Sequence, residues 1–518
     1  MNPIKKFKWF MFSCVFLFTC FDVDSKTLIH AGKLIDGKSD RVQSRISIVV
    51  DGNTIVDIQE GFISSNDFEN YIDLRNHTVL PGLMDMHVHF GGEYLSKAES
   101  PLKVEREMEA ILATQHALVT FKSGFTTVRQ VGDSGLVAIS LRDAINAGKV
   151  IGPRIFAAGK TIATTGGHAD PTNGKALDDY AYPLPEQGVV NGPYEVYTAV
   201  RQRYKDGADG IKITVTGGVL SPAKSGDNPQ FTQEEVDAVV SAAKDYGMWV
   251  AVHAHGAEGM KRAIKAGVDS IEHGTFMDDE AMDLMIENGT YYVPTISAGV
   301  WVAEKSKIDN FFPEIVRPKA ASVGPQISGT FKKAHKRGVK IAFGTDAGVQ
   351  KHGTNWKEFV YMVENGMSEM KAIQSATMET AKLLRIEDKL GSIEEGKLAD
   401  MIAVKGNPLD NQKDWKELNR FTFYDGYSHP PIINNWYRSW FSDWRATNGL
   451  SSSSNSHTFH SLLFDSGGST PLFIAAKIAD KVWLIASEFS RRSRRTVQNR
   501  KDSASCNNGL TNKSDNCL

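Results

Sequence analysis

Cysteine is scarce in this chain: only Cys14, Cys20, Cys506 and Cys517 occur among its 518 residues. The long stretch from residue 21 to residue 505 therefore contains no thiol. A core without thiols cannot depend on disulfides, and it is compatible with an oxidising compartment.

An excess of charge of either sign is also absent. Lysine and arginine total 59 and aspartate and glutamate total 61, which gives a formal net charge of −2. Such a balance provides no field to attract nucleic acid or an anionic membrane, so we expect a small-molecule substrate and no nucleic acid. With 41% hydrophobic and 23% charged residues, the composition is that of a globular protein with at least one large core.

A long uncharged apolar run is missing as well. Near the N-terminus, three lysines precede an apolar stretch from Trp9 to about Cys20, which is the layout of a secretory signal peptide and too short for a comfortable membrane span. We therefore assign residues 1–22 to a signal peptide and expect a periplasmic or secreted protein without a transmembrane span in the mature chain. Cleavage by an ordinary signal peptidase and lipid anchoring at Cys20 both stay open, because Leu17–Cys20 is only loosely similar to a bacterial lipobox.

Residues 427–518 do not continue the patterns found before them. Clustered tryptophans and a serine run are followed by the basic segment RRSRRTVQNRKD, whose low apolar content indicates disorder. The apolar segment 471–489 contains Lys477, Asp480 and Lys481 and is not a membrane span. A basic interaction tail and a late change of reading frame both fit this composition, and we assign the tail no function.

The two ends of the remaining chain have the composition of β-structure. Residues 27–61 alternate β-branched residues around Asp-Gly turns, a pattern typical of strands and hairpins. The segment KLGSIEEGKLADMIAVKGNP, residues 389–408, repeats this pattern with a strand at 400–404. We therefore predict one small β-sandwich subdomain made of residues 23–82 and 389–426.

Residues 83–388, which lie between these ends, alternate short apolar runs with helical patterns that end in glycine. Eight such units in about 300 residues fit an α/β fold, the (β/α)8 TIM barrel, whose active site lies at the C-terminal ends of its strands. The predicted strands are Leu83–His89, Thr126–Val131, Arg154–Ala158, Gly210–Thr216, Trp249–His255, Ser270–His273, Tyr291–Thr295 and Lys340–Thr345.

Side chains that can bind a metal ion lie in or just after several of these strands. They are His87 and His89 in the first strand, Lys212 in the fourth, His253 and His255 in the fifth, His273 in the sixth, and Asp346 after the eighth. Charged and imidazole groups at strand ends require partners when they leave water, so their convergence predicts a shared site. Taken alone, an HxH pair is compatible with two ordinary histidines, and Lys212 with a lysine that pairs with an acid.

This order of residues resembles the metal-binding pattern of the amidohydrolase superfamily: two histidines one residue apart, then Lys, His, His and Asp in barrel order. The segments VAVHAHGAEGMKRAIKAGVDSIEHGT, GPRIFAAGKTIATTGGHAD and GTDAG are similar to its imidazolonepropionase-related branch, which includes Xaa-Pro dipeptidase-like enzymes. The similarity extends from about Thr27 to about Pro408 and covers most of the chain.

The resemblance implies two divalent metal ions, and zinc is the expected metal because it accepts imidazole nitrogen and carboxylate oxygen. The implied ligands are His87, His89 and Asp346 for one ion, and His253 and His273 for the other. Lys212 would bridge the ions as a carbamate formed with carbon dioxide, since burial lowers the pKa of a lysine and leaves its amine neutral. Sequence alone does not decide between His253 and His255, and position in the motif favours His253 as the ligand.

The reaction implied is attack on an amide carbonyl by a metal-bridging hydroxide, because two ions lower the pKa of a shared water from ~15.7 towards ~7. Asp346 would accept the proton and pass it to the leaving amine. His168, in the loop TTGGHAD, would polarise the carbonyl or the oxyanion, and a solvent-exposed loop histidine is the alternative.

Residues that contact the substrate are expected in the loops after the fourth and eighth strands. We assign His255, Gln230 and His352 to substrate binding, with Lys224 as a further partner for a substrate carboxylate.

The sequence thus predicts an exported binuclear hydrolase of dipeptides, of the Xaa-Pro type, or of N-acyl amino acids. A deaminase is the runner-up, but deaminase branches generally lack the bridging lysine and place a glutamate shortly after the strand-five histidine, where this chain has Ala254, His255 and Gly256. A lactonase or phosphotriesterase on the same site stays open. A noncatalytic binding protein is disfavoured by the complete set of metal ligands, and a homo-oligomer is compatible with the sequence.

Overall fold

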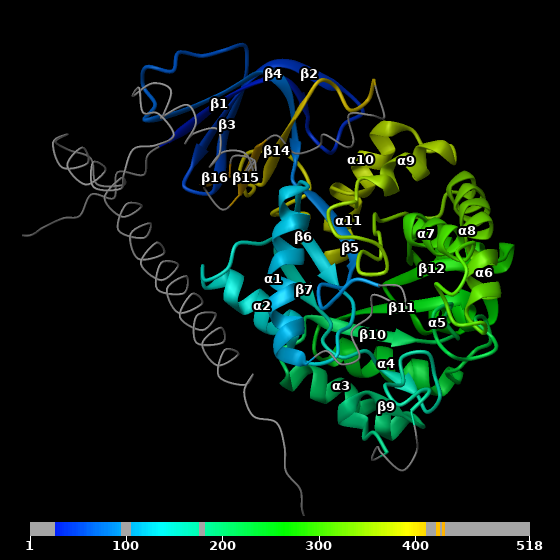
Figure 1. Cartoon of the computed structure of the whole chain (residues 1–518). Coiled ribbons are helices and arrows are strands. Elements are labelled where there is room, and N and C mark those ends of the chain that lie inside the picture. The colour runs from blue at the N-terminus through cyan, green and yellow to red at the C-terminus, as the bar shows by residue number, and fades with distance from the viewer. Residues whose placement is uncertain (1–25, 95–104, 176–181, 411–420, 425–426, 430–518) are drawn as a thin grey trace, which may run out of the picture. The chain divides into compact units, whose positions relative to one another are not determined.

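A computed structural model describes residues 26–94, 105–175, 182–410, 421–424 and 427–429 (Figure 1). The predicted signal peptide at 1–22 lies outside the described residues, as does the tail 427–518 except for residues 427–429. None of the helices in the described part of the chain combines the length and the hydropathy of a transmembrane span.

One mixed sheet of seven strands joins the two ends of the described chain (Figure 1). Strands β1 and β4 are parallel, and the other neighbouring pairs are antiparallel. In sheet order the strands are β16 (Tyr427–His429), β15 (Phe421–Tyr424), β14 (Met401–Lys405), β4 (Asn70–Pro81), β1 (Thr27–Ile35), β2 (Val42–Asp51) and β3 (Thr54–Glu60).

The predicted β-sandwich is one continuous sheet in the structure, because β4 pairs with β1 on one side and with β14 on the other. Residues 77–81 therefore lie beside residues 401–405. Alternate residues such as Ile46, Ile48 and Val50 of β2 share one buried cluster, as expected for a sheet that covers a core with one face. The sheet extends to residue 429, three residues beyond the predicted end at 426.

The hairpin between β2 and β3 shows how a short sequence signal determines local structure. Asp51 pairs with Thr54, so the loop contains two residues, and Gly52 adopts the left-handed conformation with φ of 57°. A residue with a Cβ atom would be strained there, which explains the Asp-Gly sequence at this turn.

Two parallel sheets, with helices between their strands, form the middle of the chain (Figure 1). The first contains β5 (Leu83–Val88), β6 (Phe125–Gln130) and β7 (Arg154–Ala157), and the second contains β10 (Gly210–Thr214), β11 (Trp249–Gly256), β12 (Ser270–Phe276) and β13 (Tyr291–Val293). A short parallel pair is formed by β8 (Ala163–Thr164) and β9 (Val189–Val190).

Seven of the eight predicted strands are present as strands, whereas the eighth, at residues 340–345, is present only through isolated bridges. Its backbone nevertheless bonds on two sides: Tyr292 N donates to Lys340 O, and Met86 N donates to Phe343 O. A further parallel bridge joins Ile162, just before β8, to Ile213 of β10. The predicted α/β architecture is confirmed, and the hydrogen-bonded strands form two sheets instead of one closed ladder.

Helices follow most of these strands and bury their apolar faces against them. The helices are α1 (Arg106–Lys122), α2 (Val137–Asn146), η2 (Pro185–Gln187), α3 (Pro193–Lys205), α4 (Gln233–Asp245), α5 (Ala257–Ala266), α6 (Asp279–Asn288), α7 (Ile296–Lys305), α8 (Arg317–Arg337), α9 (Lys357–Glu364), α10 (Glu369–Ser375) and α11 (Met378–Leu384). Helix α4 begins with a capping box in which the side chains of Thr232 and Glu235 satisfy free backbone N–H groups. The expected glycine ends are confirmed at Gly124 and Gly247, where φ is 93° and 68°.

Candidate active site

A cavity of about 200 Å³ lies at the C-terminal ends of the parallel strands. The structure brings to its wall all six residues predicted to bind metal, together with two predicted to act on the substrate. These residues are His87, His89, Lys212, His253, His273 and Asp346, with His168 and His255.

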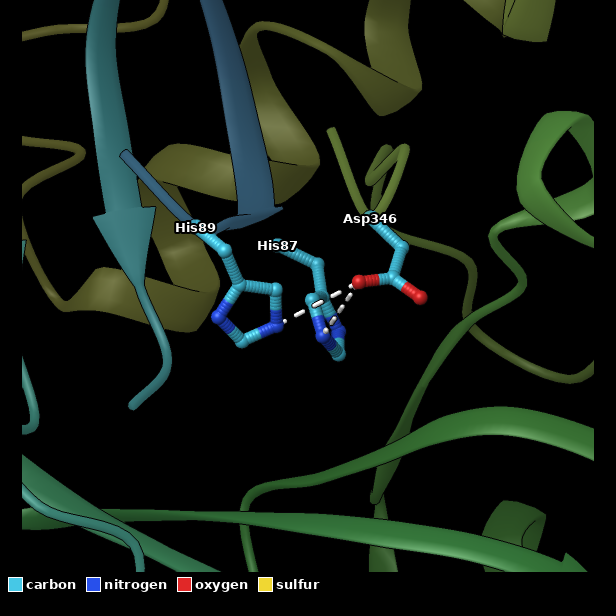
Figure 2. A group of neighbouring side chains, drawn as sticks. All are labelled: His87, His89 and Asp346. Carbon is cyan, nitrogen blue, oxygen red and sulfur yellow. Dashed lines mark ion pairs between the residues drawn. The ribbon is translucent and has the colours of Figure 1, made fainter. Parts of the chain in front are cut away.

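His87, His89 and Asp346 form a close group in this wall, with ligand atoms within 4.8 Å of one another (Figure 2). Oδ1 of Asp346 lies 3.5 Å from Nε2 of His87 and 3.3 Å from Nε2 of His89. The Nδ1 atom of each ring faces an acceptor, which is Glu272 Oε2 at 2.8 Å for His87 and Gly132 O at 3.0 Å for His89. Since these acceptors require an N–H, each Nδ1 carries the hydrogen and each Nε2 offers a lone pair beside Asp346.

His253 and His273 form a second pair across β11 and β12, with ring centroids 4.7 Å apart. Nε2 of His253 donates to Gly217 O at 3.1 Å, so the lone pair of that ring is on Nδ1. Nδ1 of His273 is bonded to Thr295 Oγ1 at 2.8 Å. A hydrogen bond thus holds each of these rings in place at one nitrogen.

His255 also faces the cavity, because it lies on the same face of β11 as His253. Its ring stacks on that of His273 with centroids 5.1 Å apart, and its Nδ1 is bonded to Thr275 Oγ1 at 2.8 Å. The distance to His273 therefore does not decide whether His253 or His255 is the metal ligand of β11. The carbonyl partner of His253 defines the tautomer of that ring, whereas a threonine hydroxyl can donate or accept and leaves the tautomer of His255 open.

Burial keeps His87, His253 and His273 neutral. Burial lowers the pKa of His87 to about 4, helped by the nearby Lys212, and it lowers the pKa of His253 and His273 well below the usual range. Burial likewise lowers the pKa of Lys212 to about 8, and among the described residues its amine makes no ion pair. Neutral imidazoles and a lysine that loses its proton readily are the groups that a metal site with a carbamate requires.

Two buried residues that the sequence analysis did not single out hold His87 in place. Glu272 is fully buried. Its carboxylate accepts a hydrogen bond from Nδ1 of His87 and another, at 2.7 Å, from Nη2 of Arg129. Burial alone would raise the pKa of Glu272, but Arg129 and His87 lower it to about 2, so the side chain is a carboxylate. The available signal was a charged residue next to His273 inside a buried strand, a position that acids occupy only when paired.

Asp85 is a third residue that the sequence analysis missed, although it lies in the same GLMDMHVHF segment as His87. Its carboxylate accepts the backbone N–H of His87 at 3.0 Å and of Thr345 at 3.1 Å, and also the side-chain amide of Asn355 at 2.8 Å. Asp85 thereby fastens the end of β5 to the residues just before Asp346.

Strained backbone is concentrated at this cavity. His273, Thr295 and Asp346, which all line it, have φ values of 68°, 51° and 56° in the left-handed region. Such a conformation costs a residue with a Cβ atom roughly 1–3 kcal/mol and is found mainly at functional sites.

His168 lines the cavity in the structure, and its ring packs on His253 at a centroid distance of 4.3 Å. Burial lowers its pKa to about 4, and its Nδ1 is buried without a hydrogen-bond partner in the described part of the chain. The ring fits because residue 218 is glycine: a Cβ atom there would lie 2.1 Å from the imidazole. The position differs from that of an exposed loop histidine.

Gln230, His352 and Lys224, expected at the substrate, do not line this cavity. Oε1 of Gln230 accepts the backbone N–H of His168 at 2.9 Å, so this side chain positions the His168 loop. The ring of His352 lies against Phe90, and Lys224 is exposed. The loops were placed correctly along the chain, but the direction of each side chain depends on tertiary contacts that spacing does not reveal.

One wall of the cavity is apolar. Its residues come from the loop after β10 and from helices α7 and α8, and they are Val219, Leu220, Ala298, Val302, Val323 and Ile327. An apolar group of a ligand would gain free energy by leaving water against this wall.

The model of the amidohydrolase family matches residues 78–431 of the chain. The chain belongs to the amidohydrolase family. A solved structure of a Xaa-Pro dipeptidase with methionine bound in the active site is 86% identical to this amidohydrolase, with a TM-score of 0.78, and covers 78% of this chain and 100% of that chain. The ochratoxinase of Aspergillus niger is 30% identical over 417 residues, which are 76% of this chain and 84% of ochratoxinase.

A more distant relative agrees with the expected branch of the family. The imidazolonepropionase of Treponema denticola is 25% identical over 367 residues, which are 66% of this chain and 80% of that enzyme. The predicted family and branch are confirmed, and this amidohydrolase is a hydrolase that acts on carbon–nitrogen bonds.

Proposed function

We propose that this amidohydrolase is a dipeptidase of the Xaa-Pro type, which also accepts N-acyl amino acids of similar shape. The observation that carries the proposal is a cavity lined by six histidines, a buried lysine and an aspartate, in a chain 86% identical to a Xaa-Pro dipeptidase over the whole length of that solved chain. A peptide bond is the carbon–nitrogen bond that such a cavity would hydrolyse.

Seven strands and the segment 340–346 would form one (β/α)8 barrel around this cavity. The proposal is supported by the backbone bonds of that segment to Tyr292 on one side and to Met86 on the other, and by the bridge between Ile162 and Ile213. Closure of the strands in this way would bring side chains from all of them to one rim.

The donor set of the cavity fits two divalent metal ions, which we take to be zinc. His87, His89 and Asp346 would hold one ion, His253 and His273 the other, and a carbamate on Lys212 would lie between them. Each of the four imidazoles has one nitrogen occupied by a hydrogen bond and the other available, as in metal sites supported by outer partners. When bound, the ions would supply a nucleophilic water and polarise the substrate carbonyl.

Asp346 and His168 would handle protons and charge during the reaction. The neighbouring His87 and His89 outweigh burial and lower the pKa of Asp346, so its carboxylate is ready to accept a proton at Oδ1 and pass it to the leaving amine. His168 is neutral and has a ring nitrogen without a partner in the described structure, so it would donate a hydrogen bond to the oxygen of the carbonyl.

The apolar wall would take the side chain of the first residue of the dipeptide. Val219, Leu220 and Ile327 offer no polar atom to a side chain there. The methionine held in the active site of the 86% identical dipeptidase supports this placement, since methionine is an apolar residue of suitable length. We expect Met-Pro and Leu-Pro to be better substrates than Asp-Pro.

A dipeptide and N-acyl-amino-acid library, tested with zinc-loaded enzyme, examines the proposal. Hydrolysis of Xaa-Pro dipeptides with apolar first residues is the expected result, and the Lys212→Ala variant should show none above background. Asp346→Asn should lower kcat by about 10²–10⁴-fold, because it removes the proton acceptor while His87 and His89 stay in place. Activity that survives in Lys212→Ala, or a preference for lactones or phosphotriesters, would contradict the assignment.

Export of the enzyme is a separate proposal that rests on residues 1–22. Fractionation of producing cells should find the protein outside the cytoplasm, and deletion of these residues should retain it inside.

A further inference from the structure

A second group of metal-binding side chains lies outside the cavity. Glu93, His116 and His352 each offer one ligand atom, and these atoms all lie within 4.8 Å of one another. Glu93 is in the loop after β5, His116 is in α1, and His352 follows the segment 340–346. None of the three lines the cavity.

The hydrogen bonds of the two histidines leave one lone pair on each ring. Nδ1 of His116 lies 2.8 Å from Phe90 O, and Nε2 of His352 lies 3.2 Å from Gly92 O. A carbonyl oxygen only accepts, so these two nitrogens carry the hydrogens, and in a neutral imidazole the other nitrogen has the lone pair. The free lone pairs are therefore on Nε2 of His116 and Nδ1 of His352.

His352 presents its lone pair in a place that water does not reach. The residue is 6% exposed, and its Nδ1 is a buried atom without a hydrogen-bond partner among the described residues. A buried polar atom left without a partner costs about 1–3 kcal/mol, so such atoms are rare unless a ligand or an ordered water satisfies them.

Charge in this group is also arranged for a cation. The rings of His116 and His352 stack with centroids 4.4 Å apart, and burial together with His116 lowers the pKa of His352 to about 3, so His352 is neutral near pH 7. Oε1 of Glu93 accepts the backbone N–H of His352 at 2.9 Å, which holds the carboxylate beside the two rings. Two imidazole nitrogens and one carboxylate are ligands that zinc and similar divalent ions prefer.

We propose that Glu93, His116 and His352 bind a third divalent metal ion of the zinc class, with water completing its coordination. This site would join α1 to two loops that begin at residues assigned to the catalytic cavity. Backbone hydrogen bonds already join the two loops: His89 N donates to Ala347 O at 2.7 Å, and Tyr94 N donates to Gly348 O at 2.6 Å. The third ion has a structural role: it holds His89 and Asp346 at their spacing and takes no part in the reaction.

Metal content measures the proposal directly. Wild type, His116→Ala, Glu93→Gln and the control His335→Ala are stripped with a chelator, loaded with zinc, freed of excess metal and analysed by mass spectrometry. His335 is a partly buried histidine of α8, stacked on Phe331, and it belongs to neither group. Both site variants should contain about one zinc ion per chain fewer than wild type and His335→Ala, because each loses one of three protein ligands.

Glu93→Gln is the variant expected to keep the fold, because its side-chain oxygen can still accept a hydrogen bond from the backbone N–H of His352. Cobalt titration gives a second readout: the absorption of one cobalt ion per chain should disappear in His116→Ala and Glu93→Gln. Equal zinc content and equal cobalt spectra in all four proteins would overturn the proposal.

The third site is independent of the dipeptidase proposal, and Lys212→Ala separates the two. The double variant Lys212→Ala/His116→Ala should contain about one ion per chain fewer than Lys212→Ala, whatever the cavity of Lys212→Ala keeps. Equal metal content in Lys212→Ala and in the double variant would refute the third site, whatever the substrate of the enzyme.

Discussion

At the scale of single residues, the hydrogen bond on one nitrogen of an imidazole decides which nitrogen is offered to the cavity. Glu272 occupies Nδ1 of His87, and the carbonyl of Gly217 occupies Nε2 of His253. The first ring therefore offers Nε2 and the second Nδ1, although both belong to the same proposed metal pair. A side chain that never touches the substrate can thus control the donor set.

Replacing Glu272 with glutamine tests this control. The amide keeps the size of the side chain but removes the charge that balances Arg129 and orients His87, so zinc affinity should fall about 10–100-fold. Competition with a chromogenic chelator measures the affinity, and circular dichroism checks that the chain is folded. The same substitution at Glu235, a buried capping residue of α4, should lower stability and leave zinc affinity unchanged. Equal affinities in wild type and Glu272→Gln would refute the role.

At the scale of elements, helix α8 holds the loop that carries part of the apolar wall. Nζ of Lys319 donates to the carbonyl oxygens of Gly218, Ser221 and Ala223 at 3.0, 2.8 and 2.7 Å. Between these anchors, Val219 and Leu220 face the cavity. One ammonium group with its three donors satisfies three carbonyls of an otherwise irregular segment.

Lys319→Met should therefore loosen the loop without touching the metal ligands. We expect KM for an apolar Xaa-Pro dipeptide to rise about tenfold, equivalent to about 1.4 kcal/mol, with zinc content unchanged. Steady-state kinetics with parallel metal analysis provide the measurement. Lys332→Met, at an exposed position of the same helix, is the matched control and should behave as wild type. A fall in zinc content in Lys319→Met would show that the loop acts through the metal pair instead.

At the scale of the whole molecule, the metal-free chain buries several neutral histidines around one cavity. Burial lowers the pKa of His87 and His168 to about 4 and of His255 to about 3, against 6.5 in the unfolded chain. Between about pH 6.5 and pH 4 the unfolded chain therefore binds more protons than the folded one. Acid should favour unfolding throughout this window.

Metal-free protein should consequently lose stability as the pH falls from 7 to 4. A histidine whose pKa falls from 6.5 in the unfolded chain to about 4 in the folded chain accounts for about 3 kcal/mol, which is lost in full only below both pKa values. Urea unfolding of chelator-treated protein at pH 7, 6, 5 and 4 measures the free energy of unfolding. His168→Asn, which replaces one of these histidines with a residue that does not titrate, should show a shallower dependence. A free energy that is flat or rises towards acid would contradict the expectation.

Local signals predicted much of the fold and most of the cavity. The Asp-Gly pair at residues 51–52 marks a hairpin because only glycine adopts that backbone without strain, and the alternation in GLMDMHVHF puts His87 and His89 on one face of a strand. The eighth strand was the weakest part of the prediction. Its residues hydrogen-bond to β13 and β5, which are distant in sequence, and they appear in the structure only as isolated bridges.

The sequence by itself determined which residue types reach the strand ends, because the two-residue period of a strand and its bounding glycines are local properties. Only the tertiary structure decided the partners of those residues. Glu272 of β12 and Arg129 of β6 orient His87, Gln230 accepts the backbone N–H of His168 instead of facing the cavity, and His352 lies beside His116 instead of in the cavity. Each of these contacts joins residues distant along the chain, and buried polar groups choose partners by proximity in space, which no local pattern encodes.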